Sequence, residues 1–214
     1  MKLKKSALNI LITAGPTREF IDPVRFISNS STGTFGWSLA KIAKQKGHNV
    51  VLLLGPNNLK PISDIKTVNF VSALDLKKLT DKFFKWADCI ICSAAVGDFR
   101  PVKVYKNKIK KNSASTEIIL KSNPDILKSL GKKKKNKILV GFALESVDLI
   151  KNAKFKLKAK NLDLLVANQL GSKRNPFGSG LTNVSIIDLL DIKKYNNISK
   201  AKLARIILDR ISSL

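Results

Sequence analysis

The strongest constraint on the fold is a repeated alternation of short apolar runs with segments of helical period. Residues 8–13 and 50–54 are apolar runs of strand length, and residues 33–46 between them carry apolar side chains at close to helical spacing. A strand, a helix and a second strand in this order form a parallel pair joined by a right-handed crossover. The pattern therefore predicts an α/β fold: a doubly wound, mostly parallel, Rossmann-like sheet flanked by helices.

The alternation continues along the chain. We expect further strands at residues 67–71, 88–93, 138–142 and 162–167, and helices at residues 73–85, 124–130 (capped by Asn123) and 147–160. Short additional strands are expected near the C-terminus, at residues 183–188 and 189–195, before a final helix over residues 199–211. Residues 98–115 hold no period, which predicts a mobile loop of about eighteen residues. No linker is apparent, so residues 1–214 are predicted to form a single domain.

The chain is strongly basic. Forty Lys and Arg residues oppose fifteen Asp and Glu residues, a formal net charge of +25, and residues 100–137 alone hold thirteen basic and two acidic residues. Such a charge suits nucleic acid, anionic lipid or a polyphosphate ligand. Abundant Lys, Ile and Asn are equally typical of a protein from an A/T-rich genome, so the charge alone does not choose a partner.

The apolar runs and the cysteines indicate a soluble cytoplasmic protein. The longest apolar stretches are too short to cross a bilayer, and residues 1–6 lead into a strand-length run, unlike the start of a signal peptide. Cys89 and Cys92 lie in one predicted strand and would point to opposite faces, which argues against a redox or metal-binding pair. We expect two reduced thiols in the core.

The loop after the first strand, residues 13–36, is the first candidate for ligand binding, because ligands of open α/β sheets bind outside the carboxyl ends of the strands. Ser30, Ser31, Thr32 and Gly33 lead into the first predicted helix, where hydroxyl and N–H groups can surround a phosphate. An ordinary helix cap explains these residues equally well. Neither GxGxxG nor GxxxxGK[ST] occurs, which weakens a dehydrogenase or P-loop interpretation.

Three further polar residues of this loop can carry chemistry. Asp22, followed by Pro23, can form a turn through local hydrogen bonds. Arg25 can clamp a phosphate or carboxylate with its planar guanidinium, or form a structural ion pair with Asp22. The amide of Asn29 both donates and accepts hydrogen bonds, and can orient an acyl intermediate. The residues alone leave these alternatives open.

Six segments resemble one enzyme family. They are ITAGPTREFIDPVRFISNSSTG, AAVGDFRP, NKIKK, NPDIL, VGFALE and KAKNLDLLVAN, and they occur in this order between Asn9 and Gly178. Together they are similar to phosphopantothenate-cysteine ligases, and DPVRFISN combined with AAVGDFRP and KIKK is the most specific part. The resemblance is to the bacterial, CTP-dependent type, without the flavin-dependent decarboxylase half that is fused to it in many bacteria.

The resemblance implies an enzyme of coenzyme A synthesis. Such a ligase activates the carboxylate of 4'-phosphopantothenate with CTP and Mg²⁺, which releases pyrophosphate and leaves an acyl-cytidylate. The amine of L-cysteine then displaces CMP. The resemblance also implies a homodimer built through the later strands, and it leaves a separate phosphopantothenoylcysteine decarboxylase as a candidate partner, with no role for nucleic acid or membrane. The nucleotide stays open, because the eukaryotic branch of the family uses ATP.

The resemblance also assigns roles to positions of this chain. Asn29, Arg25 and Lys108 are the implied catalytic residues, with Lys108 on a flexible flap that serves carboxylate activation. Asn29 and Ser30, Ser31, Thr32 and Gly33 form the expected substrate-binding loop. The implied nucleotide contacts are Gly15, Ala94, Ala95, Asp98, Lys108, Pro124, Asp125, Ile126, Leu127, Phe142, Lys156 and Lys160. The ligands of the metal are left unassigned.

Each of these residues also has a plainer explanation. Lys156 and Lys160 lie four apart on one helical face and suit a triphosphate, or they are solvated surface. Phe142 stacks on a base or belongs to the core. Asp98 accepts the cytosine amino group or approaches Mg²⁺ through water. Lys108 closes over the site and excludes water, or it is one more solvated lysine.

Two other classes of protein fit parts of the sequence. A nucleic-acid-binding protein fits the charge, but no RRM, KH or helix-turn-helix signature accompanies it. An NAD(P) oxidoreductase fits the α/β pattern, but the glycine fingerprint is missing. The tyrosine with a lysine four residues later that many such enzymes use is missing too, because Ile109 and Ser199 stand four residues after Tyr105 and Tyr195. The ligase interpretation accounts for more of the sequence than either.

Overall fold

The computed structural model describes residues 7–111, 117–145, 147–169 and 180–214. In these residues one eight-stranded sheet has the order β12-β11-β10-β9-β6-β1-β4-β5. Neighbours from β5 to β10 run parallel, whereas β11 and β12 are antiparallel additions. The strands of the sheet are β1 (Asn9–Ala14), β4 (Asn49–Leu54), β5 (Lys66–Asn69), β6 (Cys89–Cys92), β9 (Ile138–Glu145), β10 (Leu164–Gln169), β11 (Thr182–Ile187) and β12 (Ile192–Ile198).

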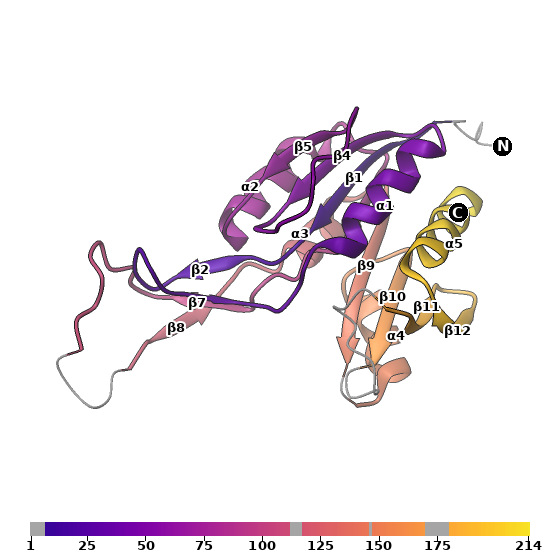
Figure 1. Ribbon diagram of the computed structural model, residues 1–214. Helices are drawn as coiled ribbons and strands as arrows, with labels where there is room; N and C mark the ends of the chain where they lie inside the picture. Colours follow the sequence, from indigo (N-terminus) through magenta and orange to yellow (C-terminus); the bar gives the residue numbers. More distant parts are fainter. Residues whose placement is uncertain (1–6, 112–116, 146, 170–179) are drawn as a thin grey trace.

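Helices cover both faces of the sheet. On one face lie α1 (Thr34–Gln45) and α5 (Lys200–Ser213), which contact each other, and on the other lie α2 (Ala73–Phe84), α3 (Ile126–Lys133) and α4 (Leu149–Ala159) (Figure 1). The predicted fold class is therefore confirmed, including the short antiparallel strands near the C-terminus. No helix in the described parts of the chain is long and apolar enough to span a membrane.

The central strand β1 shows why these residues form a buried parallel strand. Ile10 and Ile12 face the cluster under α1 and α5, while Leu11 faces the cluster on the opposite side, and all three are fully buried. Burying such a side chain stabilises a fold by about 1.5–3 kcal/mol. A strand covered on both faces has consecutive apolar residues, as residues 10–12 do.

The strand order reverses beside β1. The chain proceeds from β1 to β4 and β5 in one direction, and then returns to β6, β9 and β10 on the other side. The carboxyl ends of β1 and β6 therefore lie at a switch point, where loops leaving two neighbouring strands diverge.

Two narrow β-arms extend from this end of the sheet (Figure 1). β2 (Arg18–Phe20) pairs with β3 (Phe26–Ser28), and β7 (Phe99–Pro101) pairs with β8 (Leu120–Ser122), in both cases antiparallel. The prediction of a structureless loop at residues 98–115 is wrong at its start, since β7 lies there. The strand pattern was too short to detect, and residues 112–115 lie outside the described residues.

The start of α3 also differs from its prediction. Asp125, not Asn123, caps the helix, and its carboxylate accepts a hydrogen bond from Lys128 N at 2.9 Å. The side chain of Asn123 instead donates to Gly97 O at 2.8 Å and accepts from Arg100 Nη1 at 2.9 Å. Asn123 thus ties β8 to the segment after β6, a contact between distant residues that local helix signals do not reveal.

The two cysteines lie on opposite faces of β6, as expected, and both are free thiols. Cys89 is fully buried and Cys92 is half-buried. Burial raises the pKa of Cys89 far above its usual range and that of Cys92 to about 12. Both thiols are therefore protonated at neutral pH and poor nucleophiles.

Candidate functional site

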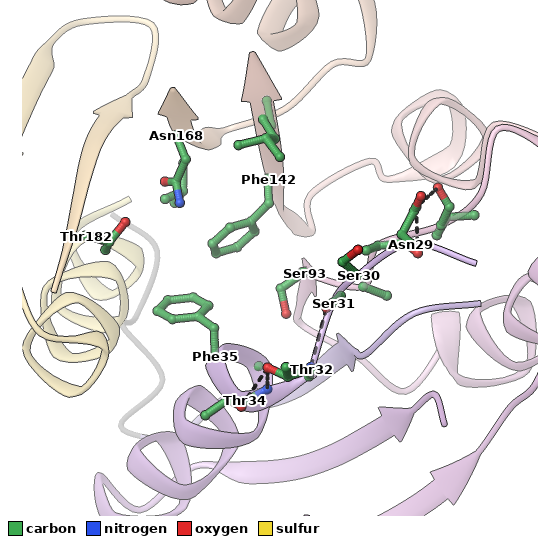
Figure 2. Close-up of a pocket in the computed structure, with 18 of the residues that line it drawn as sticks. Asn29, Ser30, Ser31, Thr32, Thr34, Phe35, Ser93, Phe142, Asn168 and Thr182 are labelled. Atoms are coloured by element: carbon green, nitrogen blue, oxygen red, sulfur yellow. Dashed lines mark hydrogen bonds between the residues drawn. The ribbon is translucent and has the colours of Figure 1, made fainter. Parts of the chain in front are cut away.

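A cavity of about 600 Å³, the main cavity, opens at the carboxyl ends of β1 and β6. Its volume lies within the range of small-molecule sites. The loop before α1, the segment after β6, the ends of β9 and β10 and the start of α5 form its wall (Figure 2). It gathers these residues that the sequence predicted: Asn29, Ser30, Ser31, Thr32, Gly33, Ala94, Ala95, Asp98, Phe142 and Lys156.

A smaller cavity of about 260 Å³, the side cavity, shares Ala94, Val96, Asp98 and Phe142 with the main cavity. Its wall also contains the start of α3 and the end of α4. The predicted nucleotide contacts Pro124, Asp125, Ile126, Leu127 and Lys160 all line it. The two cavities therefore form one recess with Asp98 and Phe142 at their junction.

The first turn of α1 faces the main cavity, and its cap residue has no side chain to cap it, although Thr34 N donates a long hydrogen bond to Thr32 Oγ1 at 3.5 Å. Gly33 occupies the cap position with φ of 75°, a left-handed conformation that favours glycine. Thr34, Phe35 and Gly36 line the cavity, and the first turn contains no acidic residue. The first N–H groups of a helix lack intrahelical partners, so this end of α1 can receive an anion.

The backbone of α1 reaches this position because Gly36 lacks a side chain. A Cβ at Gly36 would lie 2.5 Å from both Ala14 Cβ and Ser93 Oγ. The helix is therefore in direct contact with the end of β1 and the residue after β6. This close packing places the N-terminus of α1 at the switch point.

The segment after β6 is held by hydrogen bonds to the end of β1 and to the chain that follows it. Ala94 N donates to Thr13 Oγ1 at 3.1 Å, Ala95 N donates to Gly15 O at 2.9 Å, and Gly97 N donates to Thr17 Oγ1 at 3.0 Å. Gly15, a predicted nucleotide contact, is absent from the wall of either cavity and acts here through its carbonyl. Residues 94–98 thus form a fixed wall between the two cavities.

Asn29 is oriented by the same wall. Its Nδ2 donates to Ala95 O and to Val96 O, each at 3.2 Å. Within the described residues its Oδ1 has no hydrogen-bond partner, so this acceptor remains for a ligand. Asn29 therefore presents an oxygen at a fixed place at the rim of the main cavity (Figure 2).

The two predicted lysines of α4 do not act as a pair. Lys156 lines the main cavity and forms an ion pair with Glu145 at 2.6 Å. Lys160 lines the side cavity and forms an ion pair with Asp125 at 3.1 Å. Each lysine thus lines a different cavity. A phosphate that binds Lys156 or Lys160 would share the ammonium group with Glu145 or Asp125, respectively.

Sequence reasoning missed three residues on the far wall of the main cavity, namely Asn168, Thr182 and Lys200. Asn168 Oδ1 is buried and without a hydrogen-bond partner among the described residues, and it faces the cavity near Thr182 (Figure 2). Burial lowers the pKa of Lys200 from its usual value. A buried acceptor without a partner indicates a place where a ligand can donate a hydrogen bond. This acceptor can be recognised only in the folded structure, after β10 and β11 have paired.

Two half-buried aromatic rings meet at the same wall. The centroids of Phe35 and Phe142 lie 5.3 Å apart with an interplanar angle of 56°. Phe142 packs against the core beneath α1 and also lines both cavities. Its two predicted roles, core packing and contact with a ligand, are compatible in this position.

Arg25 and Lys108 lie outside the walls of both cavities. Arg25 Nη2 forms an ion pair with Asp22 at 2.8 Å and donates to Ile109 O at 2.6 Å. Lys108 is exposed on the chain that continues from β7. The structure therefore brings these two predicted catalytic residues close to each other, on the arms, and not to the cavity.

No group of three or more His, Cys, Asp or Glu side chains that could hold a metal ion occurs in the described part of the chain. Asp98 is the carboxylate that lines both cavities. Asp125, in the wall of the side cavity, already accepts a hydrogen bond from Lys128 N and pairs with Lys160. Asp98 is therefore the better candidate to hold a cation. A divalent cation here would be held by one carboxylate together with phosphates and water, which is a usual arrangement for Mg²⁺.

Comparison with known proteins finds relatives along nearly the whole chain. The model of the DNA/pantothenate metabolism flavoprotein C-terminal domain family matches residues 6–214. The coenzyme A biosynthesis bifunctional protein CoaBC of Bacillus subtilis (strain 168) is 45% identical over 179 residues, 83% of this chain and 44% of that protein. A cysteine/cysteine sulfinic acid decarboxylase of an unknown prokaryotic organism is 45% identical over 207 residues, 94% of this chain and 56% of that protein. The chain thus spans about half the length of the curated relatives it matches.

A solved structure covers the same region as this chain. The crystal structure of the C-terminal domain of the coenzyme A biosynthesis bifunctional protein CoaBC superposes with a TM-score of 0.83 and 35% sequence identity. The match covers 98% of this chain and 97% of that domain. The chain therefore corresponds to this domain from end to end.

The contact of Gly36 with the ends of β1 and β6 can be tested by adding one methyl group. Gly36→Ala should lower the free energy of unfolding by about 1–3 kcal/mol, because the new Cβ overlaps Ala14 and Ser93. Denaturant unfolding measures this difference. Gly180→Ala is the control, since no atom of the described residues lies within 4 Å of its added Cβ, and its unfolding free energy should stay near that of the wild type. Equal effects of both substitutions would contradict the proposed close approach.

Proposed function

The chain belongs to the DNA/pantothenate metabolism flavoprotein C-terminal domain family, and from this premise we propose that it is a phosphopantothenate-cysteine ligase. It joins L-cysteine to 4'-phosphopantothenate in the cytoplasm, through an acyl-cytidylate, and converts CTP to CMP and pyrophosphate. The observation that carries this proposal is the main cavity. Its wall combines two of the segments that resemble the ligases, residues 29–33 and 94–98, at the switch point of the sheet.

The first step brings two anions together. The carboxylate of phosphopantothenate attacks the α-phosphate of the nucleotide, and pyrophosphate leaves, so the site must supply positive charge along the phosphate chain. The main cavity offers the uncapped end of α1, Lys156 and Lys200 for this purpose. We place the phosphates against these three groups, because they converge on one cavity from separate elements.

The second step depends on Asn29. The amine of cysteine attacks the acyl carbon, the bond from that carbon to the phosphate oxygen breaks, and CMP leaves. Asn29 keeps its amide donors on the carbonyls of Ala95 and Val96, so its Oδ1 is the atom that accepts a hydrogen bond from the attacking amine. Such a fixed acceptor orients the amine without taking its proton.

The nucleoside belongs in the side cavity. Residues 124–127 and Lys160 form its wall, and Phe142 offers a ring face where the two cavities meet. This arrangement leaves the α-phosphate at the junction, next to Asp98. The preference for CTP over ATP rests on the sequence resemblance, and a direct competition between the two nucleotides tests it.

Mg²⁺ fits this site as an ion held mainly by the phosphates of the nucleotide. Asp98 is the residue that would hold it from the protein side. The ion would neutralise charge on the phosphates, which supports the transfer at the α-phosphate. Lys108 contributes from the arms. Closure of both arms together over the recess would bring it in as a further positive charge and exclude water from the mixed anhydride.

Exposed apolar side chains support a homodimer. Val102, Val104 and Ile119 are half or more exposed around the β7–β8 arm, and Leu189 and Leu190 are 71% and 93% exposed at the β11–β12 turn. Several large apolar side chains exposed in one part of a molecule are typical of contacts between proteins, and the arm and the turn are thus two candidate surfaces. Residues 1–214 are taken as one domain in each copy. A separate phosphopantothenoylcysteine decarboxylase is a candidate partner, since the bifunctional relatives are about twice as long as this chain.

The reaction itself gives the most direct prediction. With Mg²⁺, CTP, 4'-phosphopantothenate and L-cysteine, the protein should release pyrophosphate and CMP in equal amounts, and ATP should compete poorly. Coupled pyrophosphate detection and chromatography of the nucleotides measure both products. Absence of pyrophosphate with either nucleotide would show that the ligase assignment is wrong.

Two substitutions should separate the two steps. Asn29→Asp should let the acyl-cytidylate accumulate, because a carboxylate cannot donate to Ala95 O and Val96 O and the acceptor for the amine loses its fixed place. Lys108→Gln should instead suppress formation of the intermediate. Each effect is expected to be at least about 100-fold on the affected step. Mass spectrometry of quenched reactions detects the intermediate. Normal product formation by Asn29→Asp would refute the role of Asn29.

The homodimer can be tested in solution. Sedimentation analysis at micromolar concentration should give about twice the mass of one chain. Leu190→Lys and Ile119→Lys each place a charge on one of the two apolar surfaces, and the substitution that lies in the interface should shift the protein toward the monomer. A monomer in the unsubstituted protein would contradict the proposed assembly.

A further inference from the structure

Asp22 is a buried carboxylate in an exposed part of the molecule. It lies in the turn that joins β2 to β3, and it is fully buried although Pro23, Val24 and Arg25 beside it are exposed. The cavity walls do not include it. The mechanism above does not use it, so its burial calls for a separate explanation.

One oxygen of Asp22 serves its own turn. Asp22 Oδ1 accepts hydrogen bonds from Val24 N and Arg25 N, each at 2.9 Å. Contacts of this kind close turns in many proteins and need no further role.

The other oxygen of Asp22 reaches a distant segment. Asp22 Oδ2 accepts from Ile109 N at 3.1 Å and pairs with Arg25 Nη2 at 2.8 Å. Arg25 Nη2 in turn donates to Ile109 O at 2.6 Å. The Asp22–Arg25 pair therefore binds both the N–H and the C=O of Ile109, the residue that follows Lys108.

A third hydrogen bond joins the same two segments, from Tyr105 N to Ile21 O at 2.9 Å. Residues 105 and 109 are thus fixed to residues 21 and 22, with Lys108 between these two points of attachment. The chain that carries Lys108 is anchored on the loop that also leads to Asn29 through β3.

We propose that Asp22 is a positioning residue for Lys108, which links the Lys108 segment to the β2–β3 turn. This proposal rests on the ligase function proposed above, in which Lys108 serves carboxylate activation. A carboxylate is required because four donors converge on it, and an amide in its place would turn its NH₂ group toward at least one of them.

The ionisation of Asp22 agrees with this role. Burial alone would raise its pKa, but hydrogen bonds from the backbone N–H groups of Val24, Ile109 and Arg25, together with the charge of Arg25, lower it to about 2. Asp22 is therefore charged at every pH at which the enzyme would work. The attachment of the Lys108 segment is constant in this range and is not a pH switch.

A double-mutant cycle tests the link. Asp22→Asn should slow pyrophosphate release in a single turnover by about tenfold or more, with CTP affinity changed less than twofold, because Lys108 loses its place and the cavities do not change. In a Lys108→Gln background, Asp22→Asn should have little further effect, less than about twofold. Equal losses in both backgrounds would overturn the proposal, because a purely structural role acts independently of Lys108.

Asp188 provides a matched control. It forms the same kind of turn, accepting from Leu190 N at 2.9 Å and Asp191 N at 2.8 Å with one oxygen and pairing with Arg210 through the other. Asp188→Asn should lower the melting temperature, yet leave the single-turnover rate unchanged. If Asp22→Asn does not fold, Asp22→Glu keeps the charge and moves it by one methylene, and the same cycle is measured with it.

Trypsin cleavage tests the attachment without the reaction. Asp22→Asn should increase the rate of cleavage after Lys106, Lys108 and Lys110 relative to the wild type and to Asp188→Asn. Unchanged cleavage would overturn the proposed link. A wild type that releases no pyrophosphate but shows the expected cleavage pattern would contradict the ligase function and leave the attachment standing.

Discussion

The close contact of α1 with the ends of β1 and β6 is the interaction on which the site depends. The parallel register pairs Thr13 with Cys92, so the loops that leave β1 and β6 begin at the same level. Gly36 then lets the helix approach both strand ends, and its uncapped first turn opens on the cavity between them. The hydrogen bonds from residues 94–97 to the chain after β1 follow from the same geometry. The register of the sheet thus fixes the position of α1, and the position of α1 in turn shapes the cavity.

Only a few of the many lysines of the chain line the recess. A net charge of +25 is compatible with many anionic partners, and most of the described lysines are not among the residues that line the recess. Three described lysines line the recess, and they come from two elements: Lys156 on α4 and Lys160 at its end beside the side cavity, and Lys200 at the start of α5. Carboxylates pair with Lys156 and Lys160, which keeps the recess from being purely cationic before an anion binds. A site of this kind suits a phosphorylated substrate and a nucleotide better than it suits the regular phosphates of a nucleic acid.

Sequence patterns predicted the parts of this molecule that depend on neighbouring residues. Apolar runs identified the buried central strands, and the polar loop before α1 indicated part of the wall of the main cavity, because both signals are local. Contacts between distant segments were not predictable in this way. Asn123 was expected to cap α3 and instead donates a hydrogen bond to Gly97 O. β7 was not predicted, because it has only three residues and forms by pairing with β8, which is distant in the sequence. Asn168 carries no signal until β10 and β11 place its oxygen in the wall of the cavity, where no described residue donates a hydrogen bond to it. Arg25 and Lys108 were expected in the site by resemblance, but in this structure both lie on the arms, where Arg25 binds the carbonyl of Ile109 next to Lys108.

The central claim is that the carboxylate of the substrate attacks the α-phosphate of the nucleotide at the junction of the two cavities. Oxygen transfer tests it directly. If the carboxylate of 4'-phosphopantothenate carries ¹⁸O, attack at the α-phosphate followed by displacement with cysteine leaves one labelled oxygen in CMP and none in pyrophosphate. Mass spectrometry of the products should show this distribution. Label in orthophosphate, with CDP in place of CMP, would mean that the γ-phosphate is attacked, and it would contradict this account of the site.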